Sequence, residues 1–180
     1  WKKTPPNTQS SIIKGVLAQI SFLKGAMIKV LRGKSSFQLE ELRKHPKNFT
    51  LYLVLPARQF PTNGRWLRLM LAQTINAFEQ MGAIGHTERR TLFVLEEANS
   101  LGHMKALEKY VGLIRGYGVK LWCVYQDLNQ IKTNYDKSWE TFLGNVGIIQ
   151  TFAITDKSTT EYLSAIMGKQ EIERSRTTHS

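Results

Sequence analysis

The chain has 180 residues, of which 42% are hydrophobic and 22% are charged, values typical of one globular domain. Lysine and arginine number 25 against 14 acidic residues, and the net charge of +11 favours a polyanionic partner such as nucleic acid, anionic lipid or an acidic protein, unless it serves only solubility. The single cysteine, Cys123, excludes an internal disulfide, and no apolar run approaches the roughly 18 residues of a membrane span.

The N-terminal part predicts a loop followed by helix. Residues 1–10 are polar and contain two prolines, which predicts a loop. From Ser11 to Leu31, apolar residues recur at spacings of three and four, the pattern of one or two amphipathic helices. Because the chain starts at Trp1 and not at Met, we expect it to be a fragment of a longer protein, with room for a membrane anchor upstream.

A short segment, Gly33-Lys34-Ser35-Ser36, interrupts the helical pattern. Gly-Lys-Ser ends the phosphate-binding P-loop motif G-x-x-x-x-G-K-[ST], but Ile28 stands where that motif requires its first glycine. The segment also follows a helical pattern, whereas a P-loop follows a strand. We therefore predict that Ser35 or Ser36 begins a turn and that this segment binds no phosphate.

The middle of the chain alternates between strand and helix patterns. Phe49–Leu55 (FTLYLVL) and Thr91–Leu95 (TLFVL) are apolar and rich in β-branched or aromatic residues, so each predicts a buried strand. An amphipathic helix is predicted from Pro61 to Gly82, where glycine ends it, and another over Met104–Arg115.

The last third continues the alternation. Its predicted elements are the strand Val119–Tyr125, the short helices Leu128–Thr133 and Lys137–Leu143, the strand Gly147–Phe152, and a helix capped by Thr155 or Asp156 that runs to Met167. Apolar strands alternating with amphipathic helices indicate an α/β fold, with a mainly parallel sheet covered by helices on both faces. Ligands of such sheets bind beyond the carboxyl ends of the strands.

Two adjacent carboxylates, Glu96 and Glu97, follow the predicted strand Thr91–Leu95. An apolar strand that ends in two acids is the Walker B arrangement, in which one carboxylate holds the water shell of Mg²⁺ and the other orients and activates the attacking water. The same pattern also occurs as a solvated loop start with ordinary surface acids. From these residues alone both interpretations stay open.

Gln126 follows the next predicted strand, and Arg115 lies near the end of the preceding helix. A neutral amide at the position of Gln126 can sense a γ-phosphate or position water, or it can cap a helix. Arg115 can pair with the helix dipole, or its guanidinium can bind a phosphate of a neighbouring subunit as an arginine finger.

Other chemistries find less support in the sequence. The histidines His45, His86, His103 and His179 are dispersed, without a pair at metal-ligand spacing. Ser100 and His103 lack the G-x-S-x-G elbow of a hydrolase nucleophile. Cys123 lies in the apolar run Val119–Tyr125 and is predicted to be a core residue and not a nucleophile.

Several stretches from about Ser35 onward resemble one family. They are Ser36–Leu42 (SFQLEEL), Leu51–Pro56 (LYLVLP), Gly64–Met70 (GRWLRLM), Leu92–Gly102 (LFVLEEANSLG), Ala106–Lys109 (ALEK), Arg115–Val119 (RGYGV) and Glu161–Leu163 (EYL). Through their number, order and spacing the chain resembles the coupling proteins of type IV secretion and conjugation, the TraG/TraD-like ATPases.

The resemblance implies roles for individual residues. Glu97 corresponds to the catalytic Walker B glutamate of the family, and Glu96 stands where the family usually has Asp, a ligand of Mg²⁺ through water. Arg115 falls at the position of the arginine finger, and Gln126 at that of the third-motif glutamine. Ala98-Asn99 replaces the usual Phe-Ala, which is a second departure from the family pattern.

The resemblance also implies an architecture. Residues 47–180 would be the C-terminal part of a RecA-like nucleotide-binding domain, and residues 1–46 the end of an all-α insert domain that binds substrate. ATP and Mg²⁺ would lie between the subunits of a homo-hexamer at the cytoplasmic face of the bacterial inner membrane. The Walker A loop and the membrane helices would lie upstream of Trp1, so the fragment alone is expected to be inactive.

The implied substrate is single-stranded DNA with a bound relaxase, or an effector protein, delivered to other type IV secretion components. Two alternatives stay open. The departures at Glu96 and Ala98 also suit a degenerate adaptor that recruits substrate without hydrolysing ATP. A general DNA translocase or helicase of the same fold, unrelated to secretion, would carry a similar set of residues.

Overall fold

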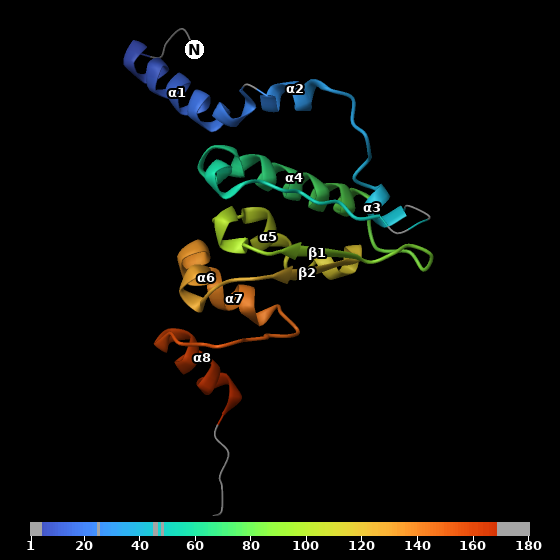
Figure 1. The fold of residues 1–180 in the computed structure, drawn as a ribbon, viewed down its shortest axis with the longest axis vertical. Coiled ribbons are helices and arrows are strands. Elements are labelled where there is room, and N and C mark those ends of the chain that lie inside the picture. Colours follow the sequence, from blue (N-terminus) through green and yellow to red (C-terminus); the bar gives the residue numbers. More distant parts are fainter. Residues whose placement is uncertain (1–4, 25, 45–46, 48, 169–180) are drawn as a thin grey trace, which may run out of the picture. The chain divides into compact units, whose positions relative to one another are not determined.

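The computed structural model describes residues 5–24, 26–44, 47 and 49–168. The chain divides into two compact units, Trp1–Val124 and Tyr125–Ser180, and Figure 1 labels their helices and strands. The domains predicted from the sequence, residues 1–46 and 47–180, follow a different division and stay a prediction.

The N-terminal helix α1, Pro6–Gln19, begins earlier than predicted. The loop predicted for residues 1–10 is therefore wrong from Pro6 onward, and the first four residues lie outside the described part. Proline suits the first turn of a helix because its fixed φ is already helical and its missing N–H would have no partner there. A 3₁₀ turn and a second helix follow, η1 (Ser21–Leu23) and α2 (Ala26–Arg32), which confirms the predicted helices in this part.

The segment after α2 forms a turn, as predicted for Ser35, whose hydroxyl donates a hydrogen bond to the carbonyl of Phe37. One helical turn, α3 (Glu41–Lys44), comes next. The strand predicted over Phe49–Leu55 is wrong, because no strand forms there. The odd-numbered residues of this segment are half-buried while Tyr52 and Val54 are 81% and 79% exposed. Apolar alternation alone does not make a strand, since a strand also needs a partner for its backbone hydrogen bonds.

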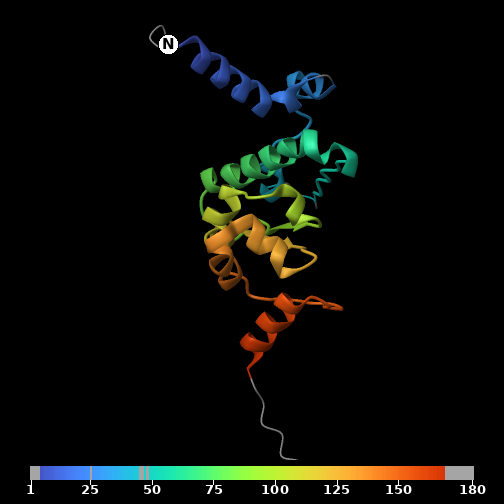
Figure 2. The ribbon, with the colours of Figure 1, turned by 90° about the vertical axis from the view of Figure 1, so that its left-hand side faces the viewer.

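The longest helix, α4 (Phe60–Gln80), supplies the core of the first unit and confirms the prediction. The 3₁₀ turn η2 (Ala57–Gln59) leads into it. Its buried face includes Ile75 and Phe78, which are almost completely inaccessible to solvent. The rings of Phe78 and Phe93 lie 5.9 Å apart, so α4 packs directly on the sheet, as Figures 1 and 2 show. Burying such an apolar side chain stabilises a fold by about 1.5–3 kcal/mol.

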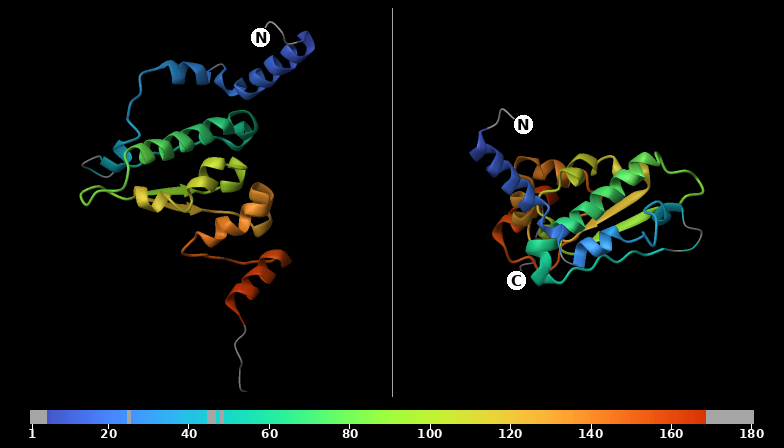
Figure 3. Two further views of the ribbon diagram at one scale, coloured as in Figure 1. Left: turned by 180° about the vertical axis from the view of Figure 1, so that it is seen from behind. Right: turned by 90° about the horizontal axis from the view of Figure 1, so that it is seen from above.

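Two parallel strands form the sheet, β1 (Thr91–Leu95) and β2 (Val119–Cys123). They run side by side from the pair Thr91–Val119 to the pair Leu95–Cys123, and the view from above in Figure 3 shows them under α4. The α/β class and both strands confirm the prediction. Phe93 faces the core, while Leu92 and Val94 on the other face are each 52% exposed.

The connection between the strands is less helical than predicted. After the 3₁₀ turn η3 (Ala98–Leu101), helix α5 covers only Lys105–Tyr110, and the chain then tightens into the 3₁₀ turn η4 (Ile114–Tyr117). Gly118 ends this turn at φ +80°. A side chain there would be strained by the positive φ and would overlap the side chain of Ile84, so the turn into β2 requires glycine.

The second unit consists of short helices and confirms those predicted. They are α6 (Leu128–Tyr135), the 3₁₀ turn η5 (Asp136–Ser138), α7 (Trp139–Gly144) and α8 (Lys157–Met167). Asp156 caps α8 by accepting a hydrogen bond from the Thr159 N–H at 2.8 Å. The Thr159 hydroxyl accepts one from the Leu128 N–H at 3.0 Å, which ties α6 to α8.

The strand predicted over Gly147–Phe152 is wrong. This segment forms no strand, and Ile148 and Phe152 are 86% and 78% exposed. As with Phe49–Leu55, the apolar composition of the segment does not by itself supply a partner strand. Among the described residues, no helix combines the length and the apolar character needed to cross a bilayer.

A buried arginine, Arg43 of α3, joins the segments at the amino end of the sheet. Its Nη1 donates to the carbonyls of Gly82 at 2.9 Å and Tyr117 at 3.3 Å. Its Nη2 donates to the carbonyl of Ala83 at 3.3 Å and to Glu88 Oε2 at 2.6 Å. Only 1% of the Arg43 side chain is exposed, so the guanidinium replaces water for all of these acceptors.

Glu88 balances the buried charge. Its carboxylate accepts hydrogen bonds from Arg43 and from the Gly85 N–H at 2.7 Å. The hydrogen bond from Arg43, and then the one from Gly85, lower the pKa of Glu88 below its ordinary value of 4.5. The ionised form of Glu88 is therefore part of the folded state at neutral pH.

We predict that Arg43→Met destabilises the fold by about 3–5 kcal/mol, because three carbonyls and one carboxylate lose their partner in a buried site. Urea unfolding followed by circular dichroism measures this difference. Arg90→Met, which removes an exposed cation nearby, is the control and should change stability by no more than about 0.5 kcal/mol. Equal stability of the Arg43→Met variant and the wild type would contradict the role of Arg43.

Stability should also depend on pH through Glu88. Because its pKa is lower in the folded than in the unfolded state, Glu88 contributes its full stabilisation above the unfolded pKa of 4.5, and this contribution is lost as pH falls through the folded value. Urea unfolding between about pH 5 and pH 2 should therefore show a smaller loss of stability for Glu88→Gln than for the wild type. Glu140→Gln, which removes an exposed carboxylate in α7, should retain the wild-type pH dependence.

Candidate active site

The two predicted carboxylates form an exposed turn at the carboxyl end of β1. Leu95, just before the turn, accepts a hydrogen bond from the Val124 N–H at 2.9 Å, and Ala98, just after it, donates to the Val124 carbonyl at 3.2 Å. Glu96 and Glu97 lie between these two bonds, and both are exposed. The backbone of one residue, Val124, therefore holds both ends of the acidic turn.

The residues after the turn anchor it in the core. Ala98 and Leu101 of η3 are buried, and the Ser100 N–H donates to the Glu97 carbonyl at 3.0 Å. The apolar residues on both sides of Glu96–Glu97 thus keep the turn in place while the carboxylates face solvent.

Gln126 belongs to the second unit, where its backbone is fixed by a capping arrangement. The Gln126 N–H donates to Gln130 Oε1 at 2.9 Å. The Gln130 N–H in turn donates to Asp127 Oδ1 at 2.9 Å, which caps α6. The Gln126 residue is exposed, so its amide is available while its backbone is held. Gln130 was not among the predicted site residues, although the spacing Asp127-x-x-Gln130 is a known capping pattern that would have indicated it.

Arg115 lies at the amino ends of the strands, whereas the two carboxylates follow the carboxyl end of β1. It is an exposed residue of η4, and its carbonyl accepts a hydrogen bond from Gly118 just before β2 begins. The acidic turn follows the other end of the strands, which are each five residues long. At about 3.3 Å per residue the strands span about 16 Å, so one chain does not bring Arg115 and Glu97 together.

The acidic turn is suited to Mg²⁺ bound mainly through water and phosphate. No group of three or more His, Cys, Asp or Glu side chains lies at metal-binding distance within the described ranges. Mg²⁺ is usually held by one or two carboxylates together with waters and substrate phosphates, and not by a cage made only of protein groups. Two exposed adjacent carboxylates fit this kind of binding.

The remaining candidate groups are the four histidines and the segment Gly33–Ser36. His86 is exposed in the loop before β1, and His103 Nε2 lies 2.7 Å from Glu108 Oε2. His45 and His179 lie outside the described residues. The segment Gly33–Ser36 follows α2 and not a strand, unlike the strand–loop–helix context of a P-loop.

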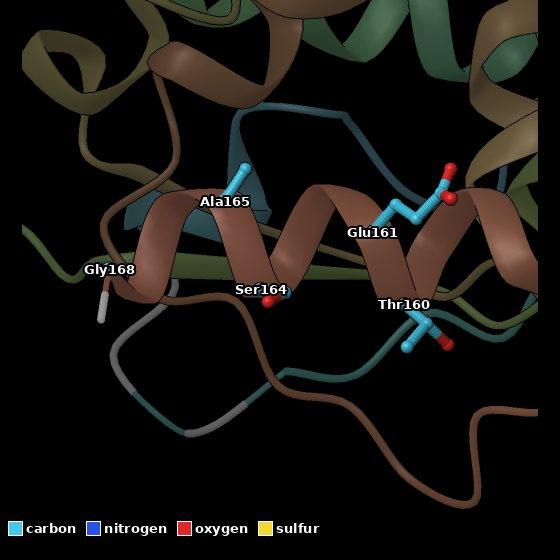
Figure 4. A pocket seen from close by; sticks show the side chains of 5 residues that line it. All are labelled: Thr160, Glu161, Ser164, Ala165 and Gly168. Carbon is cyan, nitrogen blue, oxygen red and sulfur yellow. The ribbon is translucent and has the colours of Figure 1, made fainter. Parts of the chain in front are cut away.

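A shallow depression on α8 is lined by Thr160, Glu161, Ser164, Ala165 and Gly168. Figure 4 shows four of these residues on α8 and Gly168 just after its end. Ligand sites usually bring together polar groups from several elements. This depression is therefore a weaker candidate for a ligand site than the Glu96–Glu97 turn.

The chain is thus an α/β protein in which an exposed acidic pair follows a parallel strand. It belongs to the type IV secretory system conjugative DNA transfer family, whose sequence model matches residues 1–180. This confirms the resemblance found in the sequence.

The relatives are much longer than this chain. A conjugal transfer protein TraG of Escherichia coli is 23% identical over 98% of the chain and 29% of its own length. The protein VirD4 of Rhizobium rhizogenes is 27% identical over 86% of the chain and 23% of its own length. A TraG of Agrobacterium fabrum is 24% identical over 97% of the chain and 26% of its own length. The chain thus spans less than a third of each, and no solved structure gives a significant match.

Cys123 of β2 should be unreactive in the folded protein. It is half-buried, and desolvation raises the pKa of its thiol from 9.0 to about 12. Because the thiolate is the reactive form, we predict much slower reaction with an aromatic disulfide reagent at pH 8 in native buffer than in urea. Absorbance of the released thiol measures both rates, and equal rates would contradict the apolar surroundings of Cys123.

Proposed function

We propose that the chain is the hydrolytic part of an ATP-driven motor that couples substrates to a type IV secretion apparatus. The observation that carries this proposal is the exposed Glu96–Glu97 turn at the carboxyl end of β1, held by Val124. In α/β sheets, ligands bind beyond the carboxyl ends of the strands. Membership of the conjugative DNA transfer family supports the choice of DNA transfer as the process.

The two carboxylates would have separate roles. Glu97 would orient and activate the water that attacks the γ-phosphate, as general bases do in phosphoryl transfer. Glu96 would hold the water shell of Mg²⁺. Bound Mg²⁺ would supply neutralisation of the charge that develops on the phosphates. Glu96 is one methylene longer than Asp, and the exposed turn leaves room for that extra length.

Gln126 and Arg115 would each have a separate role at a nucleotide. The Gln126 amide would sense the γ-phosphate from a backbone held by Gln130. The length of β2 separates Arg115 from Glu97 in one chain, which supports a role for Arg115 at the nucleotide of a neighbouring subunit. Such a contribution across the interface requires an oligomer, and we propose a homo-hexamer.

The proposed setting is the one that the family resemblance implies. A longer protein that contains this chain would work at the cytoplasmic face of the bacterial inner membrane, with its Walker A loop outside the 180 residues. Its substrate would be single-stranded DNA with a bound relaxase, or an effector protein, delivered to other type IV secretion components. Of the relatives, TraG is by its name a conjugal transfer protein.

We predict that Glu97→Gln in the longer protein lowers ATP turnover by about 10²–10⁴-fold, because the attacking water loses its base. Binding of a fluorescent ATP analogue should stay at the wild-type level, since the amide keeps the size of the side chain. Phosphate release measures turnover. Glu140→Gln, an exposed acid of α7, is the matched control and should hydrolyse ATP normally.

Two results would contradict the proposal in different ways. Normal hydrolysis by Glu97→Gln would show that Glu97 is not the base. Absence of ATP hydrolysis in the wild-type longer protein, with substrate binding intact, would favour the adaptor that recruits substrate without hydrolysis. The 180-residue chain alone is expected to hydrolyse no ATP.

A further inference from the structure

In the first unit, acidic and basic side chains lie near opposite ends of the strands. The acidic Glu96 and Glu97 follow the carboxyl end of β1, whereas exposed cations gather at the amino end. These cations are Lys44, Arg89, Arg90, Arg115 and Lys120. The strand length of about 16 Å separates the two groups, which exceeds the roughly 8 Å over which physiological salt screens surface charges.

Backbone contacts bring the cations together from three segments of the chain. The Arg89 N–H donates to the Arg43 carbonyl at 3.3 Å, which places the end of α3, with Lys44, beside the residues that precede β1. The Thr91 hydroxyl donates to the Leu42 carbonyl at 2.9 Å and reinforces this approach. The register pairs Leu92 with Lys120, so Lys120 lies next to the start of β1.

Basic residues outnumber acidic residues in the sequence around the amino ends of both strands. Glu88 is the one acid in residues 80–94, and Arg43 already holds its carboxylate at 2.6 Å. Residues 111–122 contain no acid at all. Other acids near this end are Glu40 and Glu41, four and three residues before Lys44, and Glu79, three residues before Gly82. Because Arg43 already binds the Glu88 carboxylate, the basic residues of this region remain in excess over its acids.

We infer that Lys44, Arg90 and Lys120 form a phosphate-binding surface for DNA at the amino end of the sheet, away from the acidic turn. This amino-end basic surface takes the sugar–phosphate backbone, because cations on a rigid scaffold neutralise phosphates regardless of base sequence. A protein that transfers DNA of any sequence needs contacts of this kind. The choice of DNA over another polyanion rests on the proposed function.

The test is the affinity of the 180-residue chain for a short fluorescent single-stranded oligonucleotide, measured by anisotropy across a salt series. The combined variant Lys44→Gln, Arg90→Gln and Lys120→Gln should lose about tenfold or more in affinity at moderate salt, and the slope of log K against log salt should fall by about 2. Thermal unfolding of the variant should match the wild type, because all three residues are exposed.

The matched control removes the same charge elsewhere. The combined variant Lys14→Gln, Lys105→Gln and Lys137→Gln also removes three exposed positive charges. It should leave the affinity and the salt slope near the wild-type values. Equal losses in both variants, no loss in the first, or no DNA binding by the wild-type chain would overturn the inference.

A second arm separates DNA from an anionic membrane. Vesicles of phosphatidylcholine and phosphatidylserine are offered to the same proteins, and loss of vesicle binding in the first variant with unchanged DNA binding would also overturn the inference. None of these measurements requires ATP. A negative result would therefore leave the assignment of Glu97 intact, and a failure of Glu97 in the turnover assay would leave the DNA measurement intact.

Discussion

The guanidinium of Arg43 is the interaction on which the first unit depends. It donates to the carbonyls that end α4 and η4 and to the carboxylate of Glu88. These acceptors belong to the segments that lead into β1 and β2, so a single buried cation sets where both strands begin. The planar fork of arginine is suited to this task because it serves several acceptors in fixed directions.

The position of the acidic turn follows from that starting point. With Thr91 opposite Val119 at one end, the register brings Leu95 opposite Cys123 at the other, and Val124 can then bond to both sides of the turn. The amino end collects cations and the carboxyl end collects acids. The two ends of one short parallel sheet thus differ chemically. We propose the amino end for DNA phosphates and the carboxyl end for the nucleotide.

Local sequence patterns were sufficient to predict the elements whose formation depends mainly on neighbouring residues. The α4 helix, β1, β2 and the Asp156 cap are close to their predictions because spacing, β-branched runs and capping residues act within a few positions. Phe49–Leu55 and Gly147–Phe152 have the same apolar composition as strands, yet form none, since partner strands are a property of the fold and not of the segment. No local sequence pattern singled out Arg43, and only its contacts 39 to 74 residues away distinguish it.

Amide hydrogen exchange in the wild type and in Arg43→Met tests most directly whether this buried contact positions the acidic turn. Thr91 N–H reports the amino end of the sheet, and Ala98 N–H reports the turn at the carboxyl end. The account predicts that both amides lose protection by a similar factor in the variant, because the strands open as one unit. Loss of protection at Thr91 with full protection kept at Ala98 would show that the turn is held independently of Arg43.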